Sequence, residues 1–231
     1  MNELSRKVVA EAVGTFFIVF AGCGAMAVAN RFPGSVAPGA VPVIFGLAVA
    51  AMIYAVGHIS GAHFNPAVTL AFAAARHFPP REVPWYWTAQ FFGAFTAIGL
   101  LAVVLPPGTD FGAPVPAVLG YQSVIWEAVL TFCLMFVIIA VATDTRAVGT
   151  MAGAAIGAAV TVGAFVGGPV TGAAMNPARA LPPLLIEGHA SSFWIYAVGP
   201  LLGALAAAYL YESIRCEVPE GRGGEKAKGC C

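Results

Sequence analysis

Asparagine followed by proline and alanine occurs twice in this chain, each time inside a long, nearly uncharged stretch. Asparagine is a good N-cap and proline fits the first helical position, so each triplet predicts a helix start. Each start follows an apolar run and opens a shorter one, which places two helix N-termini inside a membrane. Irregular backbone at that depth is tolerated only where protein buries it or it lines a water-filled cavity. The motif residues are Asn65, Pro66, Ala67, Asn176, Pro177 and Ala178.

Two helix starts that face each other near the membrane centre would select solutes by charge and by hydrogen bonding. The N-terminal ends of helix dipoles are positive and repel cations. Asn65 and Asn176 can direct amide donors into a lumen, so that a central water donates towards both sides and breaks a proton wire. The backbone before each triplet, at 59–64 and 172–175, is expected to be extended and to offer a ladder of carbonyl acceptors.

Composition places the chain in a membrane. Of its 231 residues, 59% are hydrophobic and 10% are charged, and the mean hydropathy is +0.85, which excludes an ordinary soluble domain. The formal net charge of zero gives no indication of a nucleic-acid partner. No cleavage site follows the first apolar run, so we expect that run to be a retained span. The expected environment is the lipid bilayer of the cell membrane, crossed several times.

Six apolar segments are long enough to cross a bilayer as helices, and two are too short. The long segments run at about 8–29, 40–58, 84–105, 122–142, 148–168 and 192–213. The short segments, at about 65–75 and 176–186, each begin at one of the triplets. The sequence therefore predicts an all-α membrane protein with six transmembrane helices and two half-helices.

The two halves of the chain repeat each other. Glu11-x-x-x-Thr15-Phe16 recurs as Glu127-x-x-x-Thr131-Phe132, and Ser60-Gly61-Ala62 before the first triplet matches Thr171-Gly172-Ala173 before the second. Three spans in each half, at about 7–105 and 122–213, force the second half to enter the membrane upside down. Inverted repeats with broken helices that meet near the midplane mark a transport path. We expect one channel domain over residues 1–213.

Basic residues predict the orientation of the chain. With both termini in the cytoplasm, nine of the eleven Lys and Arg residues lie on the cytoplasmic side, as the positive-inside rule requires. Arg31 then falls in the first outer loop, and Arg179 lies one turn into the second short helix. Residues 214–231 are polar and glycine-rich, and we expect a disordered cytoplasmic tail. Three interpretations of the tail thiols stay open: incidental residues, lipidation sites, or a soft site for a metal or metalloid, at Cys216, Cys230 and Cys231.

Together these motifs resemble the aquaporin (major intrinsic protein) family over about residues 7–213. The resemblance rests on His58-Ile-Ser-Gly-Ala-His-Phe-Asn-Pro-Ala-Val-Thr69 and Thr171-Gly-Ala-Ala-Met-Asn-Pro-Ala-Arg179. The stretch Val141-Ala-Thr-Asp-Thr-Arg-Ala147 is similar to the nodulin-26-like branch and its bacterial relatives. The resemblance implies a homotetramer with one pore in each subunit. The implied pore-lining residues are His63, Phe64, Gly172, Ala174 and Met175.

By the same resemblance, the narrowest point of the pore is built by Phe45, Ala164, Ala173 and Arg179. Strict water channels of the family have histidine where this chain has Ala164, and glycerol facilitators have aspartate where it has Ala180. Two alanines leave a wide opening with one aromatic wall and one cationic donor. Such an opening favours water and small neutral molecules with hydroxyl groups, such as glycerol-like polyols and metalloid hydroxides, while ions and protons are excluded.

Glu11 and Glu127 admit two interpretations. Each carboxylate can hold the backbone of the pore loop in its own half, which we favour, or the pair can serve as the coupling acids of a secondary active transporter. A structural membrane protein without solute flux is a third class of function. The sequence has no nucleophile with a base, no phosphate loop and no cluster of metal ligands. An enzyme, a cofactor and a bound metal are therefore not expected.

Overall fold

The computed structural model describes residues 1–37, 39–144 and 149–215 of the chain. Every regular element within these residues is helical. The α-helices are α1 (Glu3–Arg31), α2 (Ala40–Ser60), α3 (Pro66–Ala74), α4 (Val83–Val104), α5 (Gly120–Thr143), α6 (Ala152–Thr171), α7 (Pro177–Ile186) and α8 (Phe193–Ile214). Short 3-10 turns precede three of them, at η1 (Pro80–Glu82), η2 (Gly149–Met151) and η3 (Ala190–Ser192).

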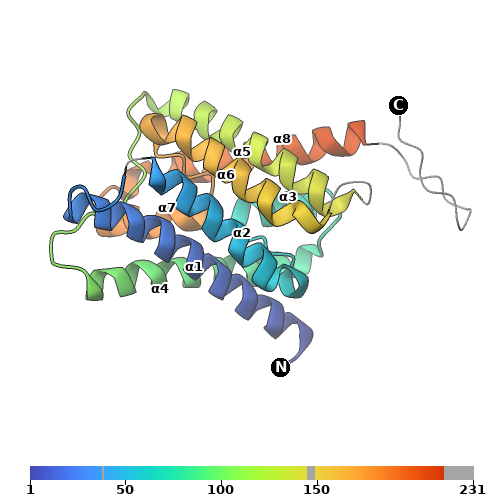
Figure 1. The fold of residues 1–231 in the computed structure, drawn as a ribbon. Coiled ribbons are helices and arrows are strands. Elements are labelled where there is room, and N and C mark those ends of the chain that lie inside the picture. The colour runs from blue at the N-terminus through green and yellow to red at the C-terminus, as the bar shows by residue number, and fades with distance from the viewer. Residues whose placement is uncertain (38, 145–148, 216–231) are drawn as a thin grey trace, which may run out of the picture.

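Six helices in the described part of the chain are long and apolar enough to cross a membrane, which confirms the predicted all-α fold with six spans. The two short helices, α3 and α7, have 9 and 10 residues and begin at the prolines of the two triplets. Figure 1 shows α3 and α7 among the long helices, with α5 and α6 along one side of the bundle and α1 and α4 along the other.

Equivalent helices of the two halves pack in the same way: α1 lies against α4, α5 lies against α8, and α2 and α6 join the halves. Glycines let the backbones approach closely at these contacts. A Cβ atom at Gly93 of α4 would overlap the carbonyl of Ala12 on α1, and one at Gly203 of α8 would overlap the carbonyl of Ala128 on α5. Small residues at such contacts are typical of helix packing within a membrane.

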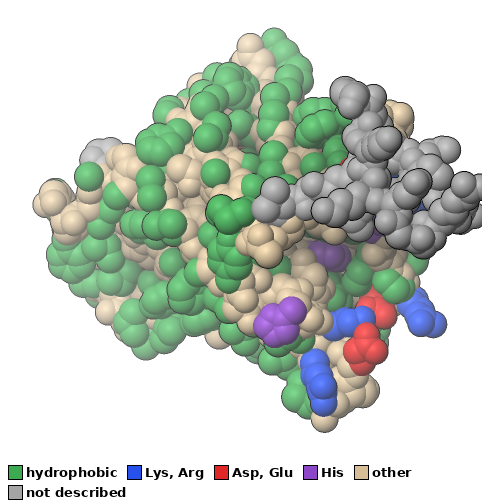
Figure 2. Space-filling model, turned by 45° about the vertical axis from the view of Figure 1, so that its right-hand side comes forward, with side chains coloured by type: hydrophobic (Ala, Val, Ile, Leu, Met, Phe, Trp, Pro, Cys, Tyr) green, Lys and Arg blue, Asp and Glu red, His purple; other side chains and the backbone are tan. Residues whose placement is uncertain are grey.

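The bundle has two distinct ends. One end, called the long-loop end here, holds the connections 32–39, 105–119 and 187–192; the other, called the terminal end, holds residue 3, the connection 75–79 and residue 215. Figure 2 shows hydrophobic side chains over most of one face, with Lys, Arg, Asp and Glu gathered at one edge of that view. Such a surface suits a protein whose sides face lipid.

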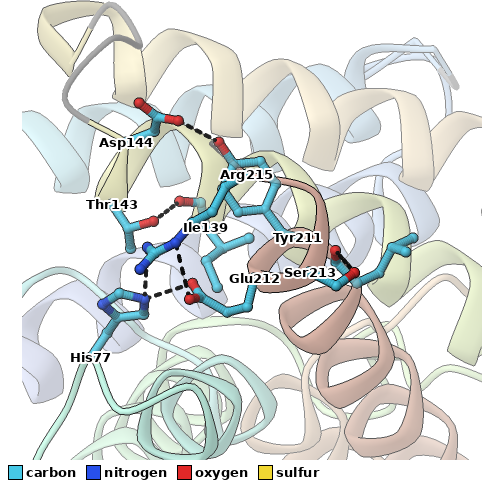
Figure 3. Close-up of polar contacts among 9 residues, drawn as sticks. His77, Ile139, Thr143, Asp144, Tyr211, Glu212, Ser213 and Arg215 are labelled. Carbon is cyan, nitrogen blue, oxygen red and sulfur yellow. Dashed lines mark hydrogen bonds and ion pairs between the residues drawn. The ribbon is translucent and has the colours of Figure 1, made fainter. Parts of the chain in front are cut away.

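Polar contacts fasten the terminal end, where α3 returns towards α4 (Figure 3). The Nε2 atom of His77 lies 2.8 Å from Oε1 of Glu212 on α8, and Nε of Arg215 lies 3.1 Å from the other carboxylate oxygen. On the same helix, Tyr211 donates its hydroxyl to Asp144 at 3.2 Å. The end of the half-helix α3 is therefore tied to α8, and α8 is tied to the residue that follows α5.

Glycines in the left-handed region end the two helices that precede the triplets. Gly61 after α2 has φ 86° and Gly172 after α6 has φ 83°. Such a C-cap lets the chain reverse without strain. The prediction of extended backbone at 59–64 and 172–175 was wrong. Residues 59 and 60 still belong to α2, whose last hydrogen bond runs from Gly61 N to the Gly57 carbonyl, and both later stretches alternate through left-handed φ values instead of staying extended.

Several predictions fall outside the described residues. Of the predicted tail, residues 216–231 lie outside, and so do Cys216, Cys230 and Cys231. Four basic residues used for the orientation, Arg146, Arg222, Lys226 and Lys228, lie outside as well.

Candidate functional site

Two non-helical segments, 61–65 and 172–176, carry the backbone into the centre of the bundle, and we call them the pore loops. Their backbones match position by position. Ala62 and Ala173 have φ 54° and 42°, and Phe64 and Met175 have φ 50° and 49°. A residue with a side chain is strained by about 1–3 kcal/mol at positive φ and persists there only where its surroundings hold it. The pore loops therefore need strong support.

Glu11 of α1 supports the first pore loop and is fully buried. Its carboxylate accepts backbone N–H groups from His63 at 3.0 Å and from Phe64 at 2.7 Å. The hydroxyl of Ser60 donates to it at 2.7 Å, and the Nε2 atom of Gln90 donates at 2.8 Å. Four donors thus converge on one carboxylate, and hydrogen bonds to a charged acceptor are roughly twice as strong as neutral ones.

Glu127 of α5 supports the second pore loop with the same geometry. It accepts the backbone N–H groups of Ala174 at 3.0 Å and Met175 at 2.7 Å, and the hydroxyl of Thr171 at 2.6 Å. This arrangement agrees with the structural interpretation of both acids, because their oxygens are occupied by donors of the pore loops. Neither carboxylate lines the cavity described below.

Two tyrosines complete the support, and the sequence analysis did not single them out. Tyr86 of α4 donates its hydroxyl to the carbonyl of Ser60 at 2.7 Å, and Tyr196 of α8 donates to the carbonyl of Thr171 at 2.7 Å. Both side chains are fully buried. Each tyrosine stands at the same position in the last helix of its half, and this repeat in the sequence is the signal that would have identified them.

Asn65 and Asn176 each bridge the two halves. Their side-chain oxygens cap α3 and α7, as predicted: Asn65 accepts from Ala67 N at 2.9 Å, and Asn176 accepts from Ala178 N at 2.9 Å. Their amide nitrogens donate across the centre, from Asn65 to the carbonyl of Met175 at 2.7 Å and from Asn176 to the carbonyl of Phe64 at 2.8 Å. One of the two N–H bonds of each amide is therefore occupied by the opposite pore loop, and the other has no partner among the described residues.

The crossing hydrogen bonds shorten the predicted ladder of carbonyl acceptors. The carbonyls of Phe64 and Met175 receive the asparagine amides, and the carbonyls of Ser60 and Thr171 receive the tyrosine hydroxyls. Within the residues that the structure describes, no hydrogen bond reaches the carbonyls of 61–63 or 172–174. Three carbonyls in each half are thus left without a hydrogen-bond donor.

A cavity of about 1280 Å³ runs along the bundle between α1, α2, α6 and the two pore loops. It extends from Asn30 and Gly34 near the long-loop end to Gly149 and Thr150 near the terminal end. Both motif asparagines line it, together with the predicted lining residues His63, Phe64, Gly172, Ala174 and Met175. The other motif residues, Pro66, Ala67, Pro177 and Ala178, are buried in the first turns of α3 and α7.

The four residues expected at the constriction meet in this cavity. Phe45 of α2, Ala164 of α6, Ala173 of the second pore loop and Arg179 of α7 all contribute to its wall. The guanidinium carbon of Arg179 lies 5.3 Å from the centre of the Phe45 ring, within cation–π range. Arg179 is 4% exposed, and its Nη1 atom has no hydrogen-bond partner among the described residues. Arg179 thus brings a nearly buried, cationic side chain to the wall of the cavity.

A polar network behind the first pore loop has no equivalent behind the second. Thr69 of α3 accepts the second hydrogen bond of Gln90 Nε2 at 2.9 Å and donates to the carbonyl of Asn65 at 3.0 Å. Nδ1 of His63 lies 3.2 Å from the same hydroxyl, and the imidazole stacks on Phe72 at 4.8 Å. The Thr69 hydroxyl therefore joins Gln90, His63 and the backbone of Asn65 in one network.

The second half has apolar residues at the matching places. Four residues after its asparagine stands Ala180, where the first half has Thr69, and four residues after its tyrosine stands Pro200, where the first half has Gln90. The sequence pattern gives no sign of the roles of Gln90 and Thr69, because their partners come from other helices. Across the described residues, no group of three or more His, Cys, Asp or Glu side chains is arranged to hold a metal ion.

Comparison with known proteins agrees with this geometry. Residues 1–211 match the family described as Major intrinsic protein. Aquaporin NIP1-1 of Oryza sativa subsp. japonica is 49% identical over 211 residues, which cover 91% of this chain and 74% of that protein. Nodulin-26 of Glycine max is 46% identical over 211 residues, covering 91% and 78%. The structure of the aquaglyceroporin from Plasmodium falciparum superimposes with a TM-score of 0.82 at 24% identity, covering 91% of this chain and 96% of that one, and so shares the fold.

Proposed function

The chain belongs to the major intrinsic protein (aquaporin) family, whose members are channels rather than enzymes, and we propose that it conducts water and small uncharged solutes passively. The single observation that carries the choice of solute is the wall formed by Phe45, Ala164, Ala173 and Arg179 in one continuous cavity. Two of these four side chains are methyl groups. The opening between the aromatic ring and the guanidinium is therefore wider than one that a large side chain fills.

Glycerol-like polyols and neutral metalloid hydroxides fit this wall as well as water does. Their hydroxyl oxygens can accept from the guanidinium of Arg179, which lines the cavity, and their hydroxyl hydrogens can donate to the carbonyls of residues 172–174, which have no other donor. A carbon face can lie against the ring of Phe45. A polyol passes such a wall by exchanging hydrogen bonds with water for hydrogen bonds with the protein at each step.

Exclusion of ions and protons follows from the charge of the same region. The N-terminal ends of α3 and α7 meet at the pore loops, and their dipoles place positive potential at the centre. Arg179 adds a full positive charge close by. Each asparagine keeps one amide N–H for the lumen, so a central water accepts from the protein and donates towards both ends.

A passive channel is favoured over a coupled transporter by the surroundings of the two buried acids. Glu11 and Glu127 are saturated by donors of the pore loops and do not line the cavity, so neither is placed to exchange a proton with a solute path. A structural membrane protein would have no use for a cavity with an unpartnered cationic donor.

The remaining parts of the proposal concern assembly and location. We place the terminal end in the cytoplasm, because Arg6, Lys7, Arg76, Arg81 and Arg215 belong to that end. Residues 1–213 form the channel domain, with repeats at about 7–105 and 122–213. The chain is proposed to act in the cell membrane as a homotetramer with one pore in each subunit.

Stopped-flow light scattering of proteoliposomes tests this function. Vesicles challenged with sucrose should shrink faster than empty vesicles, with a low activation energy, and should then re-swell when glycerol, urea or boric acid is the osmolyte. Permeability equal to that of empty vesicles would favour the structural protein. Solute uptake that requires a proton gradient, or that shows counterflow, would favour the transporter.

A further inference from the structure

Met26 on α1 is the second side chain that holds Arg179. Its sulfur atom accepts a hydrogen bond from Nη2 of Arg179 at 3.5 Å, and it lines the same cavity. Phe45 covers the face of the guanidinium, as described above. Within the described residues, the Met26 sulfur is the one hydrogen-bond acceptor for the Arg179 side chain. The position of the cation in the wall therefore depends on a thioether.

The connection between α4 and α5 holds Met26 in place. Gly112, with φ 75°, packs so closely on Met26 that a Cβ atom there would lie 2.6 Å from the sulfur. Glu187, which follows α7, fixes the backbone on both sides of this glycine, because its Oε1 atom accepts from Phe111 N at 2.7 Å and from Ala113 N at 3.1 Å. The thioether is thus confined between the connection and the guanidinium.

The chemistry of a thioether suits this place. A carboxylate would form a short, charge-assisted pair with the arginine and neutralise it. Sulfur is a weak, polarisable acceptor, so it orients Nη2 while the guanidinium keeps its positive charge. The guanidinium is kept against the wall, beside Phe45, and the lumen between it and Ala164 stays open.

We propose that Met26 is a positioning residue for Arg179 and, through it, a determinant of solute size selection in this chain. The inference deepens the proposed channel function and rests on it. When the sulfur is removed, Nη2 loses its acceptor and the guanidinium turns into the lumen to find water. Larger solutes are then obstructed more than water.

Three variants in proteoliposomes test the proposal, with water and glycerol permeability measured on the same preparations. Met26→Leu keeps the size and apolar character of the side chain but removes the acceptor, and the glycerol-to-water ratio should fall about threefold to fivefold, as expected for one weak hydrogen bond. Met26→Gln restores an acceptor on an unbranched side chain and should keep the ratio within about twofold. The control is Met52→Leu, the same substitution at a buried position on α2 that does not line the cavity, and it should leave the ratio unchanged.

Two results would overturn the role of Met26: a ratio in Met26→Leu equal to that in Met52→Leu, or equal changes in Met26→Leu and Met26→Gln. Wild-type vesicles no more permeable than empty ones would instead defeat the proposed function. The position of Arg179 can also be measured by a method that does not depend on solute flux. Glyoxal labelling of Arg179, followed by mass spectrometry with Arg31 as the internal reference, should be faster in Met26→Leu than in wild type. Equal labelling rates would contradict the proposal independently of flux.

Discussion

Gly22 on α1 lies against the ring of Phe45 on α2, so close that a Cβ atom at position 22 would overlap the ring. The same ring stands 5.3 Å from the guanidinium carbon of Arg179 on its cavity side. Because position 22 has no side chain, the Phe45 ring can lie against α1 and away from the lumen. This contact connects a glycine outside the pore motifs to the width of the constriction.

Replacing Gly22 with alanine should narrow the pore, because the added methyl group pushes the Phe45 ring towards Arg179. Overpacking of this kind costs about 1–3 kcal/mol of folding stability. If the displaced ring raises the barrier for glycerol by about 1.4 kcal/mol, glycerol flux falls about tenfold, with a smaller loss for water. The matched control is Gly99→Ala on α4, where a Cβ atom meets nothing within 4 Å. Equal fluxes in both variants would show that the ring does not bound the lumen.

A histidine in place of Ala164 should reduce glycerol flux much more than water flux. The imidazole would fill the gap opposite Phe45 and add a donor, and we expect a loss of about tenfold or more for glycerol. Light scattering with sucrose and with glycerol on the same vesicles gives both permeabilities. Parallel losses would mean that Ala164 does not lie at the narrowest point.

The positive charge of Arg179 should contribute to the exclusion of cations and protons. In Arg179→Val we expect proton leak, followed with a pH dye inside the vesicles, to rise about tenfold as one nearby charge is lost. Arg31→Val removes a charge from the end of α1, where the side chain is exposed, and serves as the control. If leak is the same in both variants, the dipoles of α3 and α7 suffice for exclusion.

Replacing either supporting acid with glutamine should destabilise the fold. The amide of Glu11→Gln or Glu127→Gln turns an N–H group towards backbone donors of the pore loops, and breaking such a buried charged network costs about 3–5 kcal/mol. Thermal unfolding in detergent should show a clear fall in the midpoint for both variants. Glu3→Gln, on the exposed first turn of α1, should shift stability by less than about 0.5 kcal/mol. If Glu11→Gln lowers the unfolding midpoint no more than Glu3→Gln does, the first pore loop does not need the carboxylate of Glu11.

The sequence was sufficient to predict the fold, the two half-helices and the acids that hold the pore loops. Apolar length gave the six spans, and the repeated triplets located α3 and α7, because helix starts are local signals. The repeated acids Glu11 and Glu127 also indicated the hydrogen bonds that hold the pore loops. Local signals do not report which side chains from distant helices meet. Tyr86 and Met26 act through partners that the bundle brings together, so neither was found.

The repeat does not extend to the residues that lie behind the two pore loops. Gln90 and Thr69 form a polar network behind the first pore loop, while Pro200 and Ala180 stand at the matching places behind the second. The sequence shows this difference only after the structure has revealed which residues of each half correspond. The residues that pack behind the first pore loop are therefore more polar than those behind the second.

The hydrogen bonds from each asparagine to the opposite pore loop can form only after both halves of the chain have been synthesised. Asn65 leaves the ribosome long before Met175, its acceptor 110 residues further along the chain, has been made. Glu11 and the Asn65 cap can hold the first pore loop as soon as the first half is made, but the Asn65 amide N–H finds its acceptor only when residues 172–176 arrive. Closing so long a segment costs only slightly more entropy than closing a short one. The two halves are therefore joined at the centre by one late step, the pairing of residues 172–176 with the first pore loop.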